Sequence, residues 1–133
     1  MAYYLVKSEP DAWSWEQQCA GGDVPWSGVR NPQALGTMRQ MQVGDEAFFY
    51  HSNVGKEIVG LVRVTRSYYP DPDDPKSGLI DVRAVSPLPR PVSLAAIKAE
   101  PRLAHIGLVR QSRLSVMPLD DAAAALLCQM GGL

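Results

Sequence analysis

The chain has 133 residues, of which 46% are hydrophobic, so it matches one ordinary domain with a single packed core and is too short for two. Its 13 basic and 14 acidic side chains nearly cancel, which excludes a purely electrostatic grip on long nucleic acid but not the binding of a small ligand or of one base of a polymer. Only Cys19 and Cys128 are present, without metal or disulfide spacing, and no leader or membrane-spanning run is apparent, so we expect reduced thiols and a cytoplasmic protein that does not bind membranes.

The first predicted elements are a strand and a short helix. Tyr3–Lys7 is rich in aromatic and β-favouring residues, and the strand is expected to end before Pro10. Ser14 and Gln17 have the spacing of a capping box, in which two side chains satisfy free backbone N–H groups at a helix start. The pair Gly21-Gly22 is expected to end this helix.

A second helix is predicted directly after the loop that holds Trp26. Asn31 is a suitable N-cap, and Pro32 suits the first helical position because its missing N–H would be unpaired there in any case. The expected core-facing stripe comprises Leu35, Met38 and Met41.

The middle of the chain is expected to form strands. Ala47–Tyr50 and Glu57–Arg66 have strand composition, and Leu79–Val85 places alternate apolar residues on one face. The proline- and aspartate-rich segment 70–75 is predicted to be an exposed loop that joins two antiparallel strands. Its acidic residues lack the ligand spacing of a calcium loop, so no metal is expected there.

The last third is predicted to contain a helix capped by Ser93 that runs through Ala99, a strand at Leu114–Val116, and a helix over Asp120–Gln129. Short strands and helices mixed in this order indicate an α+β domain. Its mainly antiparallel sheet is expected to curve and close on itself as a small β-barrel flanked by short helices.

The segment from Trp26 to Asn31 has the chemistry to hold a flat polar ligand. The indole of Trp26 offers a stacking face, and Gly28 allows close approach of the backbone. Arg30 and Asn31 add hydrogen-bond donors suited to base edges or phosphates.

Several motifs together resemble the EVE domain family across nearly the whole chain. They are Lys7-Ser8-Glu9-Pro10, Trp26-Ser27-Gly28-Val29-Arg30-Asn31, Gly44-Asp45, Phe48-Phe49-Tyr50-His51-Ser52-Asn53, Ile58-Val59-Gly60, Tyr69-Pro70-Asp71, Leu108-Val109-Arg110 and Arg113-Leu114-Ser115-Val116. The resemblance implies a single domain over residues 1–133 with a PUA-like pseudobarrel, related to YTH and ASCH modules.

The resemblance further implies a non-catalytic module, without a cofactor, that recognises a modified cytosine or adenine in DNA or RNA. The base would come from a single strand or be flipped out of a duplex. The matching ligand-binding positions are Lys7, Ser8, Trp26, Ser27, Gly28, Val29, Arg30, Asn31, Tyr50, His51, Ser52 and Asn53. Arg110 and Arg113 are the candidates for phosphate contacts.

Each candidate also has an ordinary structural interpretation. Trp26 is suited to a core, His51 to hydrogen bonds at a strand end, and Arg30 to a helix C-terminus or a carboxylate such as Glu9. Arg110 and Arg113 are suited to solvent or to ion pairs. Trp13 and Trp15 are expected to pack the first helix against the sheet.

Two other classes of function stay open at this point. An enzyme acting on RNA or a nucleotide is one, although no catalytic set is recognisable. A protein-interaction module is the other, and it predicts a buried Trp26 with no cavity beside it. The sequence leaves open the choice among DNA, RNA and free nucleotide, the modification, and the oligomeric state.

Overall fold

A computed structural model describes all 133 residues and contains six strands and five α-helices. In chain order they are β1 (Tyr3–Ser8), α1 (Trp15–Gly21), β2 (Val24–Trp26), α2 (Pro32–Gln40), β3 (Glu46–His51), β4 (Glu57–Pro70), β5 (Gly78–Ser93), α3 (Leu94–Lys98), the 3-10 turn η1 (Pro101–Leu103), α4 (Gly107–Arg110), β6 (Val116–Leu119) and α5 (Asp121–Gly131). The predicted α+β class is confirmed. None of the helices has the length and hydropathy needed to cross a membrane.

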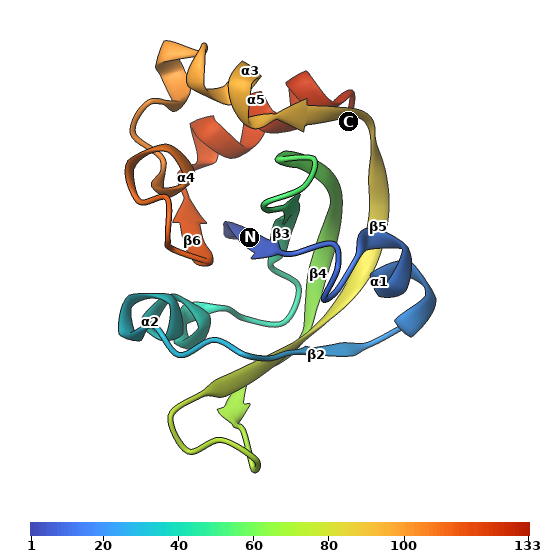
Figure 1. The fold of residues 1–133 in the computed structure, drawn as a ribbon, viewed down its shortest axis with the longest axis vertical. Helices are drawn as coiled ribbons and strands as arrows, with labels where there is room; N and C mark the ends of the chain where they lie inside the picture. Colours follow the sequence, from blue (N-terminus) through green and yellow to red (C-terminus); the bar gives the residue numbers. More distant parts are fainter.

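One mixed sheet has the strand order β2-β5-β4-β3-β1-β6. Every neighbouring pair is antiparallel except β1 and β3, which run parallel. Long β4 and β5 bend along the height of the molecule and curl the sheet (Figure 1). The predicted curved, mainly antiparallel sheet is therefore confirmed.

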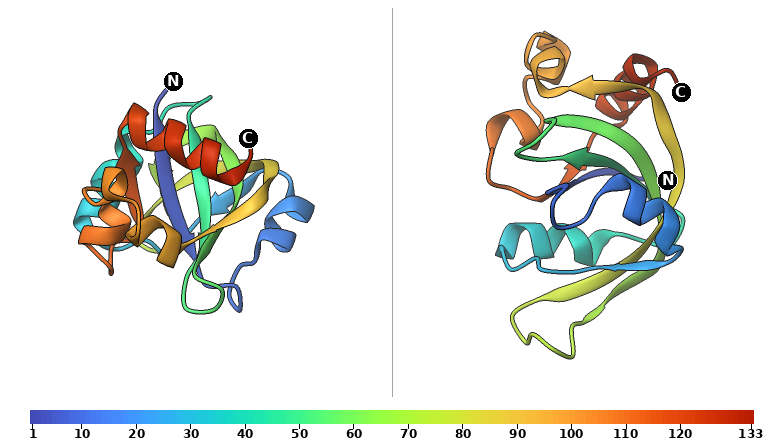
Figure 2. Two further views of the ribbon diagram at one scale, coloured as in Figure 1. Left: turned by 90° about the horizontal axis from the view of Figure 1, so that it is seen from above. Right: turned by 45° about the vertical axis from the view of Figure 1, so that its right-hand side comes forward.

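Hydrogen bonds do not close this sheet into a complete barrel, because β2 and β6 form its two free edges. Helix α2 packs against β6, β4 and β5, so it bridges the two ends of the sheet in place of a strand pair. Helix α5 packs on β5 and β1, across the other end of the molecule (Figure 2). The architecture is a pseudobarrel whose open side is covered by a helix.

The core is centred on β3, where Phe48 and Phe49 are fully buried on opposite faces of the strand. The predicted stripe of α2 is buried as well, with Leu35, Met38 and Met41 all in the core. Burial on both faces explains why β3 reads as a continuous apolar run and not as an alternating one.

Local capping signals are confirmed at three helix starts. The hydroxyl of Ser14 accepts from the N–H of Gln17, and the Gln17 side chain accepts from the N–H of Ser14. Asn31 accepts from the N–H of Ala34, with Pro32 in the first turn of α2. Ser93 caps α3 in the same way.

Several element bounds differ from those predicted. Strand β5 continues past Val85 to Ser93 despite three prolines, because Pro89 and Pro91 lie in an irregular stretch of the pairing with β4 and Pro87 lies at its edge. The prediction of a loop at β2 is wrong. Its three residues form a strand because they pair with β5, which the local sequence does not show. The last strand begins at Val116 and not at Leu114, and the single turns η1 and α4 were not predicted.

Candidate functional site

A cavity of about 520 Å³ lies between the end of β1, the turn that leads into α1, and the segment that begins with β2. Figure 2 (right) shows the blue segment after β1 above the lighter blue connection from β2 to α2. This volume lies within the range usual for small-molecule sites, about 300–1,000 Å³. Its lining includes these predicted ligand positions: Lys7, Ser8, Trp26, Ser27, Gly28 and Val29.

Half of the cavity wall was not predicted from sequence. These additional lining residues are Glu9, Ala12, Trp13, Val24, Pro25 and Ser115. They come from the turn after β1, from β2 and from the residue before β6. The cavity therefore joins segments from both ends of the chain.

Trp26 has a structural role and also lines the cavity. Its side chain is only 6% exposed, and its ring meets Phe49 edge to face with the centroids 5.6 Å apart. The backbone of Trp26 is fixed by pairing with Ile80 of β5. The open cavity beside the indole is contrary to what the protein-interaction interpretation predicted.

Trp13 is a second indole of the cavity wall, although the sequence suggested only a packing role. Its Nε1–H donates to Oε1 of Gln18 at 2.9 Å, and the fully buried Gln18 donates in turn to the carbonyl of Val82 at 3.3 Å. This chain of hydrogen bonds holds the half-buried ring between α1 and β5. The only sequence signal for it was an indole just before the Ser14 cap.

The end of β1 provides the polar wall of the cavity. The Nζ of Lys7 donates to the carbonyl of Ser112 at 2.8 Å, and burial lowers the pKa of this amine. The hydroxyl of Ser8 donates to the carbonyl of Trp13 at 2.5 Å. Because the N–H of Lys7 also bonds to the carbonyl of Ser115, the segment before β6 is held beside the cavity.

The predicted cluster from Tyr50 to Asn53 lies outside the cavity lining. The Nε2 of His51 accepts from the N–H of Trp15 at 3.1 Å, and burial lowers the pKa of the imidazole. Tyr50 is buried, which raises the pKa of its phenol, and the N–H of Ser52 donates to the carbonyl of Ser8 at 2.9 Å. Asn53 occupies a left-handed turn position with φ of 62°. The contacts of His51 and Ser52 thus hold the start of α1 and the end of β1.

Arg30 and Asn31 also do not line the cavity. Asn31 is occupied as the N-cap of α2. Arg30 pairs with Asp74 at 2.8 Å and not with Glu9, and this contact lowers the pKa of the Asp74 carboxyl. The pair joins the residue that follows the lining segment Trp26–Val29 to the connection between β4 and β5.

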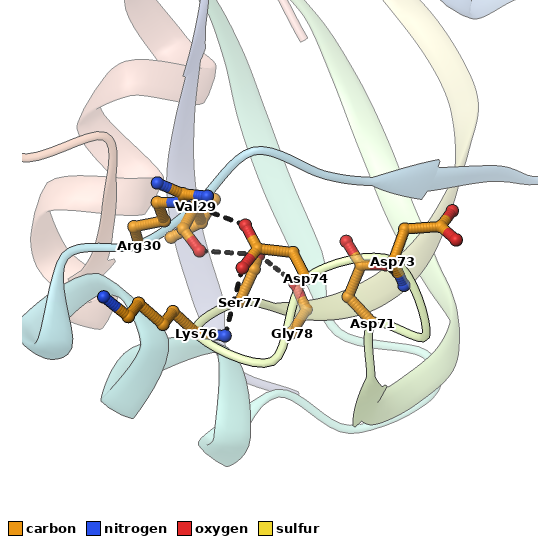
Figure 3. A network of polar contacts seen from close by, with 8 residues as sticks. All are labelled: Val29, Arg30, Asp71, Asp73, Asp74, Lys76, Ser77 and Gly78. Carbon is orange, nitrogen blue, oxygen red and sulfur yellow. Dashed lines mark hydrogen bonds and ion pairs between the residues drawn. The ribbon is translucent and has the colours of Figure 1, made fainter.

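The tip of the β4–β5 hairpin supports the cavity wall from outside (Figure 3). The buried hydroxyl of Ser77 donates to the carbonyl of Val29 at 2.7 Å. The carboxylates of Asp71 and Asp74 accept backbone N–H groups of their own loop. Within the whole chain, no three histidine, cysteine or acidic side chains come together in a way that would hold a metal ion.

Replacing Ser77 with alanine is expected to lower the free energy of unfolding by about 1–3 kcal/mol, because the Val29 carbonyl loses its partner. Urea denaturation followed by circular dichroism measures this change. Asp74→Asn is the matched control in the same loop. It weakens the pair with Arg30, while the amide oxygen of the asparagine can still accept from the N–H of Lys76. The denaturation midpoint should stay nearly unchanged, whereas equal effects of both variants would contradict the assignment.

Arg110 and Arg113 belong to the segment that holds Ser112, whose carbonyl accepts from Lys7, and Ser115, which lines the cavity. Both side chains are exposed, and neither forms an ion pair. By contrast, the guanidinium of Arg83 in β5 is paired with the carboxylate of Asp23. The two unpaired cations are therefore available to an anionic partner.

Comparisons with known proteins agree on one family. The model described as "EVE domain" matches residues 2–130. Thymocyte nuclear protein 1 of Homo sapiens is 34% identical over 160 residues, covering 90% of this chain and 69% of that protein.

Two solved structures have closely similar folds. The NMR structure of Rpa0253 from Rhodopseudomonas palustris has a TM-score of 0.94 at 53% identity, covering 99% of this chain and 94% of that one. The crystal structure of human THYN1 in complex with 5-methylcytosine-containing DNA has a TM-score of 0.92 at 28% identity, covering 100% of this chain and 99% of that one.

Proposed function

Because this chain belongs to the EVE domain family, we propose that it is a non-catalytic module that recognises a modified nucleobase, a cytosine or an adenine, in DNA or RNA. The observation that carries the proposal is the cavity bounded by Trp13 and Trp26. The human relative bound to DNA containing 5-methylcytosine supports this class of ligand.

In the proposed complex, one base leaves its strand and enters the cavity, where an indole supplies a stacking surface. Trp13 is the more exposed of the two rings, and Trp26 forms the deeper wall. Stacking on an aromatic side chain contributes about 1–3 kcal/mol per base and discriminates poorly between bases. Selectivity therefore has to come from polar groups such as those of Ser27 and Ser115, and from the shape of the cavity.

The remaining predicted positions have supporting roles in this proposal. Ser8, Gly28 and Val29 shape the cavity. The supporting residues outside it are Arg30, Asn31, Tyr50, His51, Ser52 and Asn53. We further propose a single domain over residues 1–133 that acts in the cytoplasm, which the free thiols of Cys19 and Cys128 support.

The test is a binding panel of short single-stranded DNA and RNA oligonucleotides, each with one modified cytosine or adenine, beside unmodified controls. Fluorescence polarisation with the purified full chain measures each dissociation constant. We expect a clear preference for one modified base over its unmodified form. Equal affinity for modified and unmodified strands throughout the panel would overturn the proposal.

The double variant Arg110→Gln, Arg113→Gln is expected to weaken binding of modified and unmodified strands by the same factor. Loss of two phosphate contacts should also reduce the slope of log affinity against log salt by about 1.4 on single strands. Binding titrations at several salt concentrations measure both effects. The double variant Arg83→Gln, Arg102→Gln is the control, since it also removes two positive charges, from ion-paired side chains that do not line the cavity. Loss of selectivity with an unchanged salt slope would contradict a phosphate role.

A further inference from the structure

Two opposite charges line the cavity without pairing with each other. Lys7 and Glu9 both belong to its wall, yet no ion pair joins them. Glu9 is the only acidic residue of the lining, and its carboxylate has no hydrogen-bond partner within the protein. A donor on a ligand would therefore meet a free acceptor at this position.

The backbone around Glu9 is held in place. Its carbonyl accepts from the N–H groups of Ala12 at 2.9 Å and Trp13 at 2.8 Å. The ring of Pro10 fixes its own φ angle and limits the backbone conformation of Glu9. Lys7 uses one N–H of its ammonium on Ser112, which leaves two donors for a ligand. The cavity thus presents a strong acceptor and a strong donor from the same strand end.

An acceptor beside a donor complements a base edge that has a donor beside an acceptor. Cytosine has this pattern in its N4 amino group and N3, and adenine has it in N6 and N1. Thymine and uracil carry a keto oxygen where cytosine carries the amino group, and that oxygen would face a carboxylate without a shared proton. Two acceptors that face each other without a proton between them repel, so such a base is expected to bind more weakly.

We infer that Glu9 is a specificity-determining residue that accepts a hydrogen bond from the exocyclic amino group of the bound base. The inference rests on the proposed function and names the residue that selects its amino-bearing bases, cytosine and adenine, over thymine and uracil. It assigns to Lys7 the neighbouring ring nitrogen or keto oxygen.

The sharpest test compares 5-methylcytosine with thymine, which share the methyl group at C5 and differ in the amino or keto group at C4. Two single-stranded DNAs identical except at this one base are titrated against the full chain. We expect the unsubstituted protein to bind the 5-methylcytosine strand at least about tenfold more tightly. Glu9→Gln should reduce this preference to about twofold or less, since an amide can also donate to the keto oxygen.

Glu16→Gln is the matched control, because Glu16 is also exposed and unpaired but does not line the cavity. It should retain the full preference. Far-UV circular dichroism verifies that both variants are folded, as expected for exposed side chains.

Each outcome decides a different point. If the unsubstituted protein binds both strands equally, the amino-group selection is wrong while base binding stands. If Glu9→Gln retains the tenfold preference, another residue reads the amino group. If neither these two strands nor any strand of the panel binds, the proposed function and the role of Glu9 both fail.

Discussion

Replacing Trp26 with alanine is expected to lower the free energy of unfolding by about 3–5 kcal/mol and to remove selective binding. The indole is 6% exposed and packs on Phe49, so its loss opens a hole in the core next to the ligand cavity. Domains of this kind have a total stability of about 5–15 kcal/mol, so the variant is expected to lose a large fraction of it. Urea denaturation followed by far-UV circular dichroism gives the stability, and polarisation titration gives the affinity.

Two further variants separate the structural from the ligand-binding contribution of this indole. Trp26→Phe keeps an aromatic ring against Phe49 and should restore most of the stability. Trp13→Ala removes a half-buried ring from the same cavity and should weaken binding roughly tenfold with a smaller loss of stability. If Trp26→Ala folds and binds with unchanged selectivity, the assignment of the cavity is wrong.

Gly60→Ala is expected to be strongly disruptive, although it adds only one methyl group to the sheet. A Cβ at this position would clash with the Cη2 atom of Trp15, because the indole lies directly over the glycine. Trp15 also packs on Phe49 with centroids 5.3 Å apart, and its N–H bonds to His51. Displacing the ring should cost about 1–3 kcal/mol and loosen the start of α1.

Thermal denaturation and binding titrations measure the two consequences for Gly60→Ala. Affinity should fall together with stability, since Trp13 of the cavity wall lies two residues before the start of α1. Gly36→Ala is the matched control, because its added Cβ meets no atom within 4 Å in α2. It should stabilise the protein by about 0.5–1 kcal/mol. A similar loss in both variants would contradict the packing explanation.

Much of the secondary structure could be predicted because its signals are short-range. The Ser14 capping box, the Asn31-Pro32 pair and the start of α5 at Asp120 all depend on groups within a few residues of one another. The family motifs likewise predicted the α+β fold. Strand β2 escaped prediction because a three-residue strand broken by Pro25 has no periodicity to detect.

The candidate site was predicted only in part. The segment from Trp26 to Val29 and the end of β1 were identified from their chemistry, and they do line the cavity. Trp13 and Glu9 were missed as ligand positions, since the turn that folds them toward β2 has no distinctive pattern. For Arg30 the structural alternative named a carboxylate such as Glu9, and the hairpin loop supplies a different one, that of Asp74.

The sequence by itself determined the helix caps, the buried stripes and the family, because each depends on neighbouring residues or on motifs in a set order. Only the tertiary structure decided which side chains line the cavity and which contact the segments that form its wall. The decisive contacts join Lys7 to Ser112 and Val29 to Ser77, pairs that are 105 and 48 residues apart. Contacts at such separations arise from how the sheet curls, and no local pattern in the chain encodes them.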